Sequence, residues 1–197
     1  MILKNMENYL KNMALLISGG IPSSITSTTA GKKTLLPLVT TLNETITDFY
    51  ATTGCRAPFD ANNTLTLSTN QTDTKNAEYS KTYIGLGTGT TPVTENDYKL
   101  ETKISSGLSL VSSDTEIVNA ISLNEDKTEL KRVSTLRASV KNIDSKEITI
   151  NEIGFYQVPN NMHSVLLYRE VLDTPVTVGV GAVATFEFTF VFKNQLQ

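Results

Sequence analysis

The sequence predicts a mainly β protein, an antiparallel β-sandwich of the jelly-roll or immunoglobulin-like kind, with an N-terminal α-helix and an extended arm. From residue 83 onward, short segments with alternating apolar residues recur about every 10 to 15 residues, separated by turn-forming residues. No helical period lies between these segments, which argues against a parallel sheet with crossover helices. Threonine, serine and asparagine are plentiful, and threonine suits strands with one solvated face.

Residues 2 to 18 form the one segment with a clear helical period. Gly19 and Gly20 follow it, and Pro22 confirms that the helix ends there. A helix this short is not stable alone. The row of apolar residues along it must therefore pack either on the chain's own body or on copies of the chain. We expect an oligomer or anchor seam, made of residues spaced three and four apart: Leu3, Met6, Leu10, Met13 and Ile17.

Residues 19 to 82 are weakly patterned, with short apolar stretches among Ser, Thr, Gly and Pro. Such a segment predicts short strands and long loops that become ordered against a neighbouring subunit. We therefore divide the chain into residues 1–82, a helix and arm for anchoring or oligomerisation, and residues 83–197, the β-sandwich domain.

Residues 148 to 157 and 183 to 192 give the clearest strand patterns. In the first, alternation slips phase at Glu152 beside Gly154, which predicts a β-bulge. The second is the clearest half-buried strand. Its predicted inward face consists of Phe186, Phe188, Phe190 and Phe192.

Gly85, Gly87 and Gly89 raise the possibility of a phosphate-binding loop. The third glycine of a dinucleotide fingerprint and the lysine of a P-loop are absent, and Pro92 follows with no long helix behind it. Residues 94 to 97 have the form of a capping box that opens a turn or two at most. We therefore predict that the glycines are architectural, letting the strand pass close to another backbone or twist sharply.

A further turn is predicted at Asp173 and Pro175, where the aspartate caps the turn and the proline suits an edge. Gly179 and Gly181 then allow the chain to reverse before the phenylalanine strand.

The charged pair Arg169 and Glu170 lies just before this turn. We expect one of the two on the solvated face of the sheet. A buried ion pair of Arg169 with Glu152 is the alternative that the pattern leaves open.

Composition and charge exclude several classes of function. The net charge is −3 with no basic stripe, so nucleic acid is not an expected partner. No apolar run approaches the roughly 18 residues of a membrane span, and we expect neither a membrane segment nor a signal peptide.

Catalysis and metal binding also lack the residues they need. Cys55 is the single cysteine and His163 the single histidine, so we expect no intrachain disulfide, no zinc site and no cysteine or serine nucleophile with its base. Acid pairs such as Glu95 with Asp97, or Glu125 with Asp126, fall in polar turns where carboxylates are usually solvated. We therefore expect a non-enzymatic protein with no catalytic residue, metal or cofactor.

Three segments resemble a pattern found in small virion proteins of tailed bacteriophages, including head-fibre, decoration and tail-associated proteins. They are "IGLGTGTTPVTENDYKLE", "ITINEIGFYQ" and "LLYREVLDTPVTVGVGAVATFEFTF", and together the resemblance spans about residues 83–192. The motifs are structural, so the resemblance implies no catalytic residue.

The resemblance implies a virion structural protein, made in the host cytoplasm and assembling symmetrically as a head-fibre or capsid decoration component. Its expected partners are further copies, as a homotrimer joined by the helix seam, and other virion proteins of the capsid, the portal and neck, or the tail. One alternative is a structural protein of the tail or neck, such as an adaptor, tube or baseplate component. Another is a receptor- or carbohydrate-binding module acting through loops 124–128 and 158–163, although aromatic residues make up only 7% of the chain.

Overall fold

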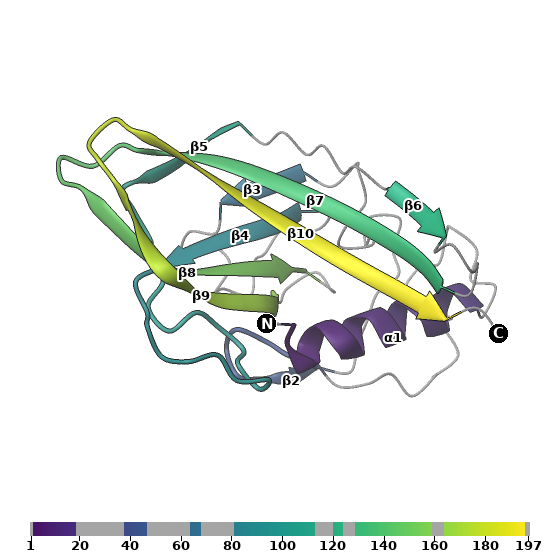
Figure 1. The fold of residues 1–197 in the computed structure, drawn as a ribbon. Coiled ribbons are helices and arrows are strands. Elements are labelled where there is room, and N and C mark those ends of the chain that lie inside the picture. Colours follow the sequence, from purple (N-terminus) through teal and green to yellow (C-terminus); the bar gives the residue numbers. More distant parts are fainter. Residues whose placement is uncertain are drawn as a thin grey trace.

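The computed structural model describes residues 2–18, 38–46, 64–67, 81–112, 120–123, 129–158 and 164–195, and every structural statement below refers to these ranges. Within them the protein is mainly β, as predicted, with one helix and two larger sheets (Figure 1). The elements in chain order are α1 (Lys4–Ser18), β1 (Leu38–Val39), β2 (Thr45–Ile46), β3 (Thr64–Leu67), β4 (Lys81–Gly87), β5 (Leu108–Ser112), β6 (Ala120–Leu123), β7 (Glu129–Asn142), β8 (Ile148–Gln157), β9 (Val165–Val178) and β10 (Val183–Gln195).

The two larger sheets are antiparallel except at one edge. The first has the order β3-β4-β8-β9, in which β3 pairs with β4 in parallel and the other neighbours are antiparallel. The second has the order β10-β7-β5, with β6 pairing farther along the same side of β7 as β5 does. Strands β1 and β2 form a small separate hairpin.

Strands β7 to β10 form one long hairpin that is folded back on itself. β8 and β9 are neighbours in the first sheet, and β7 and β10 are neighbours in the second. The connections 143–147 and 179–182 lie at the same end of the molecule (Figure 1). They are held together there by Asn142, whose N–H donates to Ala182 C=O (2.9 Å) and whose C=O accepts from Gly181 N–H (3.0 Å). Both arms of the hairpin therefore cross from one sheet to the other at the same place.

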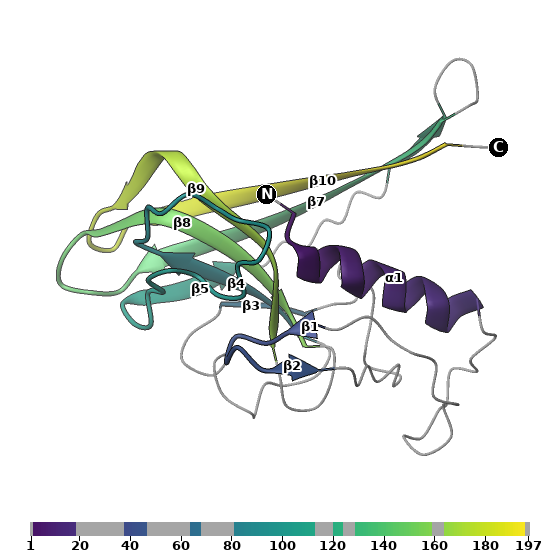
Figure 2. The same ribbon diagram turned by 90° about the horizontal axis from the view of Figure 1, so that it is seen from below.

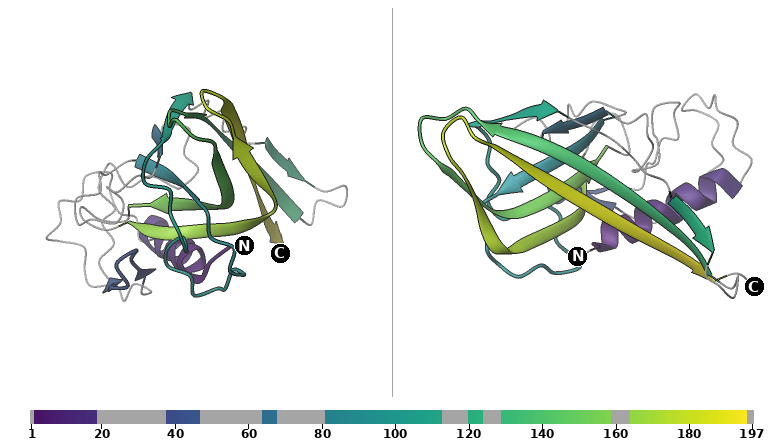
Figure 3. Two further views of the ribbon diagram at one scale, coloured as in Figure 1. Left: turned by 90° about the vertical axis from the view of Figure 1, so that its left-hand side faces the viewer. Right: turned by 45° about the horizontal axis from the view of Figure 1, so that its top comes forward.

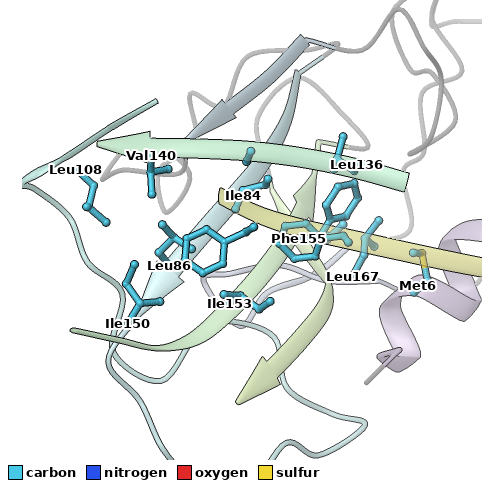
Figure 4. Close-up of a cluster of buried hydrophobic side chains, with 14 of the residues drawn as sticks. Met6, Ile84, Leu86, Leu108, Leu136, Val140, Ile150, Ile153, Phe155 and Leu167 are labelled. Atoms are coloured by element: carbon cyan, nitrogen blue, oxygen red, sulfur yellow. The ribbon is translucent and has the colours of Figure 1, made fainter. Parts of the chain in front are cut away.

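The main core lies between the two sheets, which enclose it when the molecule is seen end-on (Figure 3). The first sheet contributes Ile84, Leu86, Ile153 and Phe155, which point toward side chains of the second sheet (Figure 4). Burial of these large apolar side chains is the main stabilising contribution that the alternating strands provide. The members contributed by the second sheet are Leu108, Leu136, Ala138, Val140, Phe186 and Phe188.

The first sheet is bulged where β8 meets β9. Ile150 pairs with Val176 but Glu152 pairs with Val171, so residues 172–175 of β9 face Asn151 alone. The bulge predicted near Glu152 is therefore present, but the extra residues belong to β9. Asp173 and Pro175, predicted to form a turn, instead lie exposed within this bulge of a continuous strand.

The chain reverses a few residues later, between β9 and β10. Ala182 N–H donates to Gly179 C=O (3.0 Å), and Gly181 has φ 73°, a left-handed conformation that favours glycine. The reversal predicted from the two glycines is therefore confirmed.

Helix α1 packs on the chain's own body. Leu3 and Met6 are buried, and Tyr9, which the predicted seam omits, is also fully buried. Asn5, one residue from Met6, is buried too, and its side chain bonds to the backbone of Val39 and of Leu166. The expectation of an oligomer seam is therefore corrected for Leu3 and Met6, because the chain's own core already uses them.

The other seam residues differ in what the structure describes. Leu10 is partly buried and packs against the main core. The side chains of Met13 and Ile17 lie outside the described part, and the seam remains a prediction for these two. The boundary between residues 82 and 83 also stays a prediction, although α1 and β3 both join the body that β4 to β10 form.

The N-terminal residues also cover the start of the outer edge of β9. Ile2 forms an antiparallel bridge with Tyr168, and Leu3 N–H donates to Leu167 C=O (3.2 Å). Thr41 N–H donates to Ser164 C=O (3.1 Å), just before the strand begins. The start of this edge is therefore covered by the chain itself, as natural sheets often require.

Candidate functional site

The face of the first sheet that points away from the main core is also covered. The segment 88–102 connects β4 toward β5 and lies over this face, with Leu100 packed in a second apolar cluster. Leu100 N–H donates to the hydroxyl oxygen of Tyr156 (3.3 Å), which fixes the end of the segment on the sheet. The remaining buried members of this cluster are Leu3, Tyr83, Val158 and Leu166.

The glycines of β4 make room for the side chains under this segment. A Cβ at Gly85 would lie 2.6 Å from Cε2 of Tyr156, and one at Gly87 would lie 2.5 Å from Oε1 of Glu152 and 2.6 Å from the backbone oxygen of Thr102. A Cβ at Gly89 would also lie 2.5 Å from Glu152 Oε1. The predicted close approach is therefore confirmed. None of the three glycines has a positive φ.

Glu152 occupies the space that Gly87 and Gly89 leave. Its side chain is fully buried and accepts hydrogen bonds from three backbone N–H groups of the covering segment. Oε1 accepts from Gly89 (3.2 Å) and Thr102 (2.8 Å), and Oε2 accepts from Glu101 (3.1 Å). One carboxylate therefore ties together both ends of the segment 88–102.

Arg169 is the counter-ion of Glu152. Its guanidinium donates from Nε to Glu152 Oε2 (2.8 Å), from Nη1 to Asp97 Oδ2 (2.7 Å) and from Nη2 to Thr91 C=O (3.2 Å). Only 3% of Arg169 is exposed. The expectation of a solvated position is therefore wrong for Arg169, and the buried pair with Glu152 is the arrangement found. The physical reason is that the segment 88–102 covers a sheet face that the strand pattern alone leaves open.

Asp97 and Glu101 complete what we call the Arg169 cluster: Asp97, Glu101, Glu152 and Arg169. Asp97 is half-buried, and its carboxylate accepts from the backbone N–H (3.1 Å) and hydroxyl (2.7 Å) of Thr94. This contact forms the single turn that the capping-box pattern predicted. The prediction that Asp97 is merely solvated is therefore wrong, because Arg169 lies against it.

Glu101 organises the other side of the turn. Its Oε2 accepts from the N–H groups of Thr90 and Thr91 (both 2.8 Å), and its Oε1 accepts from the Thr91 hydroxyl (2.6 Å). These bonds hold Thr91 in place, so that its carbonyl can accept from Arg169.

The hydrogen bonds determine the ionisation of this cluster. Burial raises the pKa of Asp97, but hydrogen bonds from Thr94 and Arg169 outweigh it and hold this pKa below its ordinary value. The Thr91 hydroxyl and backbone N–H hold the pKa of Glu101 below its ordinary value as well. Burial lowers the pKa of Arg169, but the hydrogen bonds to Asp97 and Glu152 outweigh this effect and raise the pKa above its ordinary value. The guanidinium therefore stays charged.

The Arg169 cluster is arranged to stabilise the fold. The guanidinium donates three hydrogen bonds to protein acceptors, the Glu152 carboxylate accepts four from protein donors, and Glu152 is fully buried. Arginine suits this role because its planar fork can bond several acceptors at once. The cluster therefore acts as a clamp that holds the segment 88–102 on the sheet.

Several residues singled out from the sequence fall elsewhere. Cys55, His163, Glu125 and Asp126 lie outside the described residues, as do loop 124–128 and all of the second predicted loop except Val158. Among the residues that the structure places, no group of three or more His, Cys, Asp or Glu side chains is arranged to hold a metal ion. The described helix is too short and too polar to cross a membrane.

The fold and the clamp together place the chain in the class of mainly β proteins, with a first sheet that is covered on both faces. No protein-family model matches the chain, and comparisons with curated proteins and with solved structures found no match.

Proposed function

We propose that this chain is a non-enzymatic structural protein of a tailed-bacteriophage particle, acting as a head-fibre or capsid decoration component. The observation that carries the proposal is where the three virion-like segments lie. They supply the four charged members of the Arg169 cluster: Asp97 and Glu101 come from the first, Glu152 from the second and Arg169 from the third. What the segments share is therefore a single packing unit and not a set of reacting groups.

The small residues of the same segments fit this interpretation. Gly87 and Gly89 leave space for the Glu152 carboxylate, and Gly154 leaves space for Leu100, whose Cδ2 would lie 2.8 Å from a Cβ there. A pattern of glycines and charges that serves only to hold a loop on a sheet is expected in a building block. It gives no reason to assign a substrate.

The arrangement of the strands supports a finer description of the fold. A long hairpin whose two arms fold together from one sheet onto the other is how a jelly roll is built. We therefore favour a jelly-roll-like sandwich over an immunoglobulin-like one for residues 83–197.

The partners proposed for this role are further copies of the chain and other virion proteins. A homotrimer joined by α1 now depends on the distal half of the helix, because Leu3 and Met6 pack internally. Residues 1–82 remain the candidate anchor to the particle, and the protein would be found in the virion after synthesis in the host cytoplasm.

Antibody labelling of purified particles tests this function. Gold-conjugated antibody raised against the chain should decorate the heads of intact particles in electron micrographs, at many sites per head. Label confined to the neck or tail would replace the decoration role by the tail or neck alternative. Particles that contain the gene but carry no label would contradict the proposal. If the purified chain then bound host cells or glycans, the result would favour a receptor-binding module.

A further inference from the structure

The outer edge of β10 is a long sheet edge that the described part of the chain leaves uncovered. β10 has 13 residues and pairs only with β7, and no hydrogen bond joins its other side to another described segment. The start of the β9 edge is covered by residues 2, 3 and 41, and the bulge at residues 172–175 interrupts the rest of that strand. The other edge strands, β3, β5 and β6, are short, with 4, 5 and 4 residues. A long open strand presents a row of unpaired N–H and C=O groups to a further strand.

The distal half of β10 projects beyond the main body. There β7 and β10 continue as a narrow ribbon away from the two sheets (Figure 2). β6 joins this ribbon on the β7 side, so β10 remains outermost. Val191 lies in this part and is 46% exposed. Narrow ribbons are marginally stable in water, and an added strand on the β10 side would widen this one.

The sequence of β10 is complementary to itself when two copies run antiparallel. If the two-fold axis passes through Phe190, a residue a given number of positions before Phe190 in one copy faces the residue the same number of positions after it in the other copy. Oppositely charged residues then face each other on both sides of the axis, and apolar or threonine residues fill the centre. The facing positions are Phe190 with Phe190, Thr189 with Val191, Phe188 with Phe192, and Glu187 with Lys193.

Other registers lack this match. An axis at Glu187 places two glutamates opposite each other, which is destabilising. Within one chain, moreover, Lys193 is in register with Lys131 of β7, so the register places no acidic residue opposite it there. A second copy would supply a glutamate at this register position from the open side. Glu187 is half-exposed, with its carboxylate bonded to Arg137, and so remains accessible from that side.

We propose that β10 is a homodimerisation edge, with two copies of the chain paired antiparallel about Phe190 to make one continuous sheet, β5-β7-β10-β10-β7-β5. The interface is isologous, as in most symmetric dimers, since each copy uses the same strand. The proposal does not depend on the virion role, because it rests on β10 alone. It predicts even-numbered assemblies, unlike the trimer expected from the helix seam.

A charge exchange between two variants tests the pairing and its register. Glu187→Lys alone places lysine opposite lysine at both ends of the dimer, and Lys193→Glu alone places glutamate opposite glutamate. Light scattering should give twice 21.5 kDa for the wild type, with each variant dimerising about tenfold more weakly. An equimolar mixture of the two variants restores both opposite-charge pairs, so its mass should return to that of the dimer, as should the mass of the double variant.

The exposed pair Glu7 and Lys11 on α1 provides the matched control. Glu7→Lys and Lys11→Glu make the same charge changes on α1, outside the sheet that contains β10. Both variants should therefore leave the dimer unchanged. Unfolding curves of all variants separate a lost interface from a lost fold. A wild type that stays at 21.5 kDa up to about 1 mM, or two β10 variants that do not recover on mixing, would overturn the proposal.

Cysteine crosslinking reports the register independently. Facing residues have Cα atoms about 4.5 to 5.5 Å apart, within reach of a disulfide. In a Cys55→Ser background, Thr189→Cys mixed with Val191→Cys should form a covalent dimer under mild oxidation faster than either variant does alone. Equal rates in all three samples would exclude this register.

Discussion

Replacing Arg169 by methionine is the most informative perturbation of the clamp. Methionine keeps the apolar length of the side chain but removes all three donors, to Glu152, Asp97 and Thr91. The Glu152 carboxylate would then remain fully buried without its counter-ion. A buried charge that loses its partner keeps its desolvation cost, and this makes the loss large.

The expected magnitude follows from the contacts that remain. Removing one member of a buried pair typically costs about 3–5 kcal/mol. Glu152 would still accept from the backbone N–H groups of Gly89, Glu101 and Thr102, so we expect the low end, about 3 kcal/mol. With a urea dependence of about 2 kcal/mol per molar, the unfolding midpoint should fall by about 1.5 M.

Urea unfolding followed by circular dichroism measures this shift, with Arg137→Met as the matched control. Arg137 pairs with Glu187 at 2.6 Å, but both side chains are about half-exposed, so its loss should cost about 0–1 kcal/mol. Adding Glu152→Gln to Arg169→Met should recover part of the loss, because no buried charge then remains. Equal midpoints for Arg169→Met and Arg137→Met would refute the buried clamp.

Three further predictions use the same unfolding assay. Gly87→Ala should destabilise the protein by about 2 kcal/mol or more, because its Cβ would meet the Glu152 carboxylate and a backbone oxygen, whereas Gly179→Ala, with no atom nearer than 3.9 Å, should be nearly neutral. Asn5→Ala should cost about 2 kcal/mol, because it leaves buried backbone groups of two strands without their partner; a change below about 0.5 kcal/mol would count against this role. Stability should be constant from about pH 8 to pH 5 and fall below about pH 4.5, since the pKa values of Asp97 and Glu101 lie below their ordinary 3.8 and 4.5 and the stabilisation is lost as these groups take up protons. Asp97→Asn should make that fall shallower, and an unchanged acid profile would contradict the assignment.

The strands could be predicted from the sequence because alternation directly reports a sheet with a buried face. The pattern through Phe186 and Phe188 and the slip beside Gly154 both correspond to described features, a core-facing strand and a bulge. The parallel pairing of β3 with β4 could not be predicted, because it joins segments whose sequence carries little pattern.

The Arg169 cluster shows where strand patterns stop being informative. Strict alternation from Leu167, which faces the main core, would place Arg169 on the core face, but the register shift between Phe155 and Tyr156 places it on the opposite face. Nor does alternation say that a loop covers that face. The available signal was the run of small residues, since Gly85, Gly87 and Gly154 all lie on that same face and leave space for bulky side chains. Helix α1 differs from its predicted seam for a similar reason, because Asn5 is buried through bonds to distant strands that no helical period reveals.

The copy number of the chain in purified particles tests the central proposal most directly. Absolute quantification by mass spectrometry, relative to the major capsid protein, should find the chain in particles purified through a density gradient, at a fixed and symmetry-related ratio. Particles in which the chain is absent, or present only at trace and variable levels, would contradict a structural role in the virion.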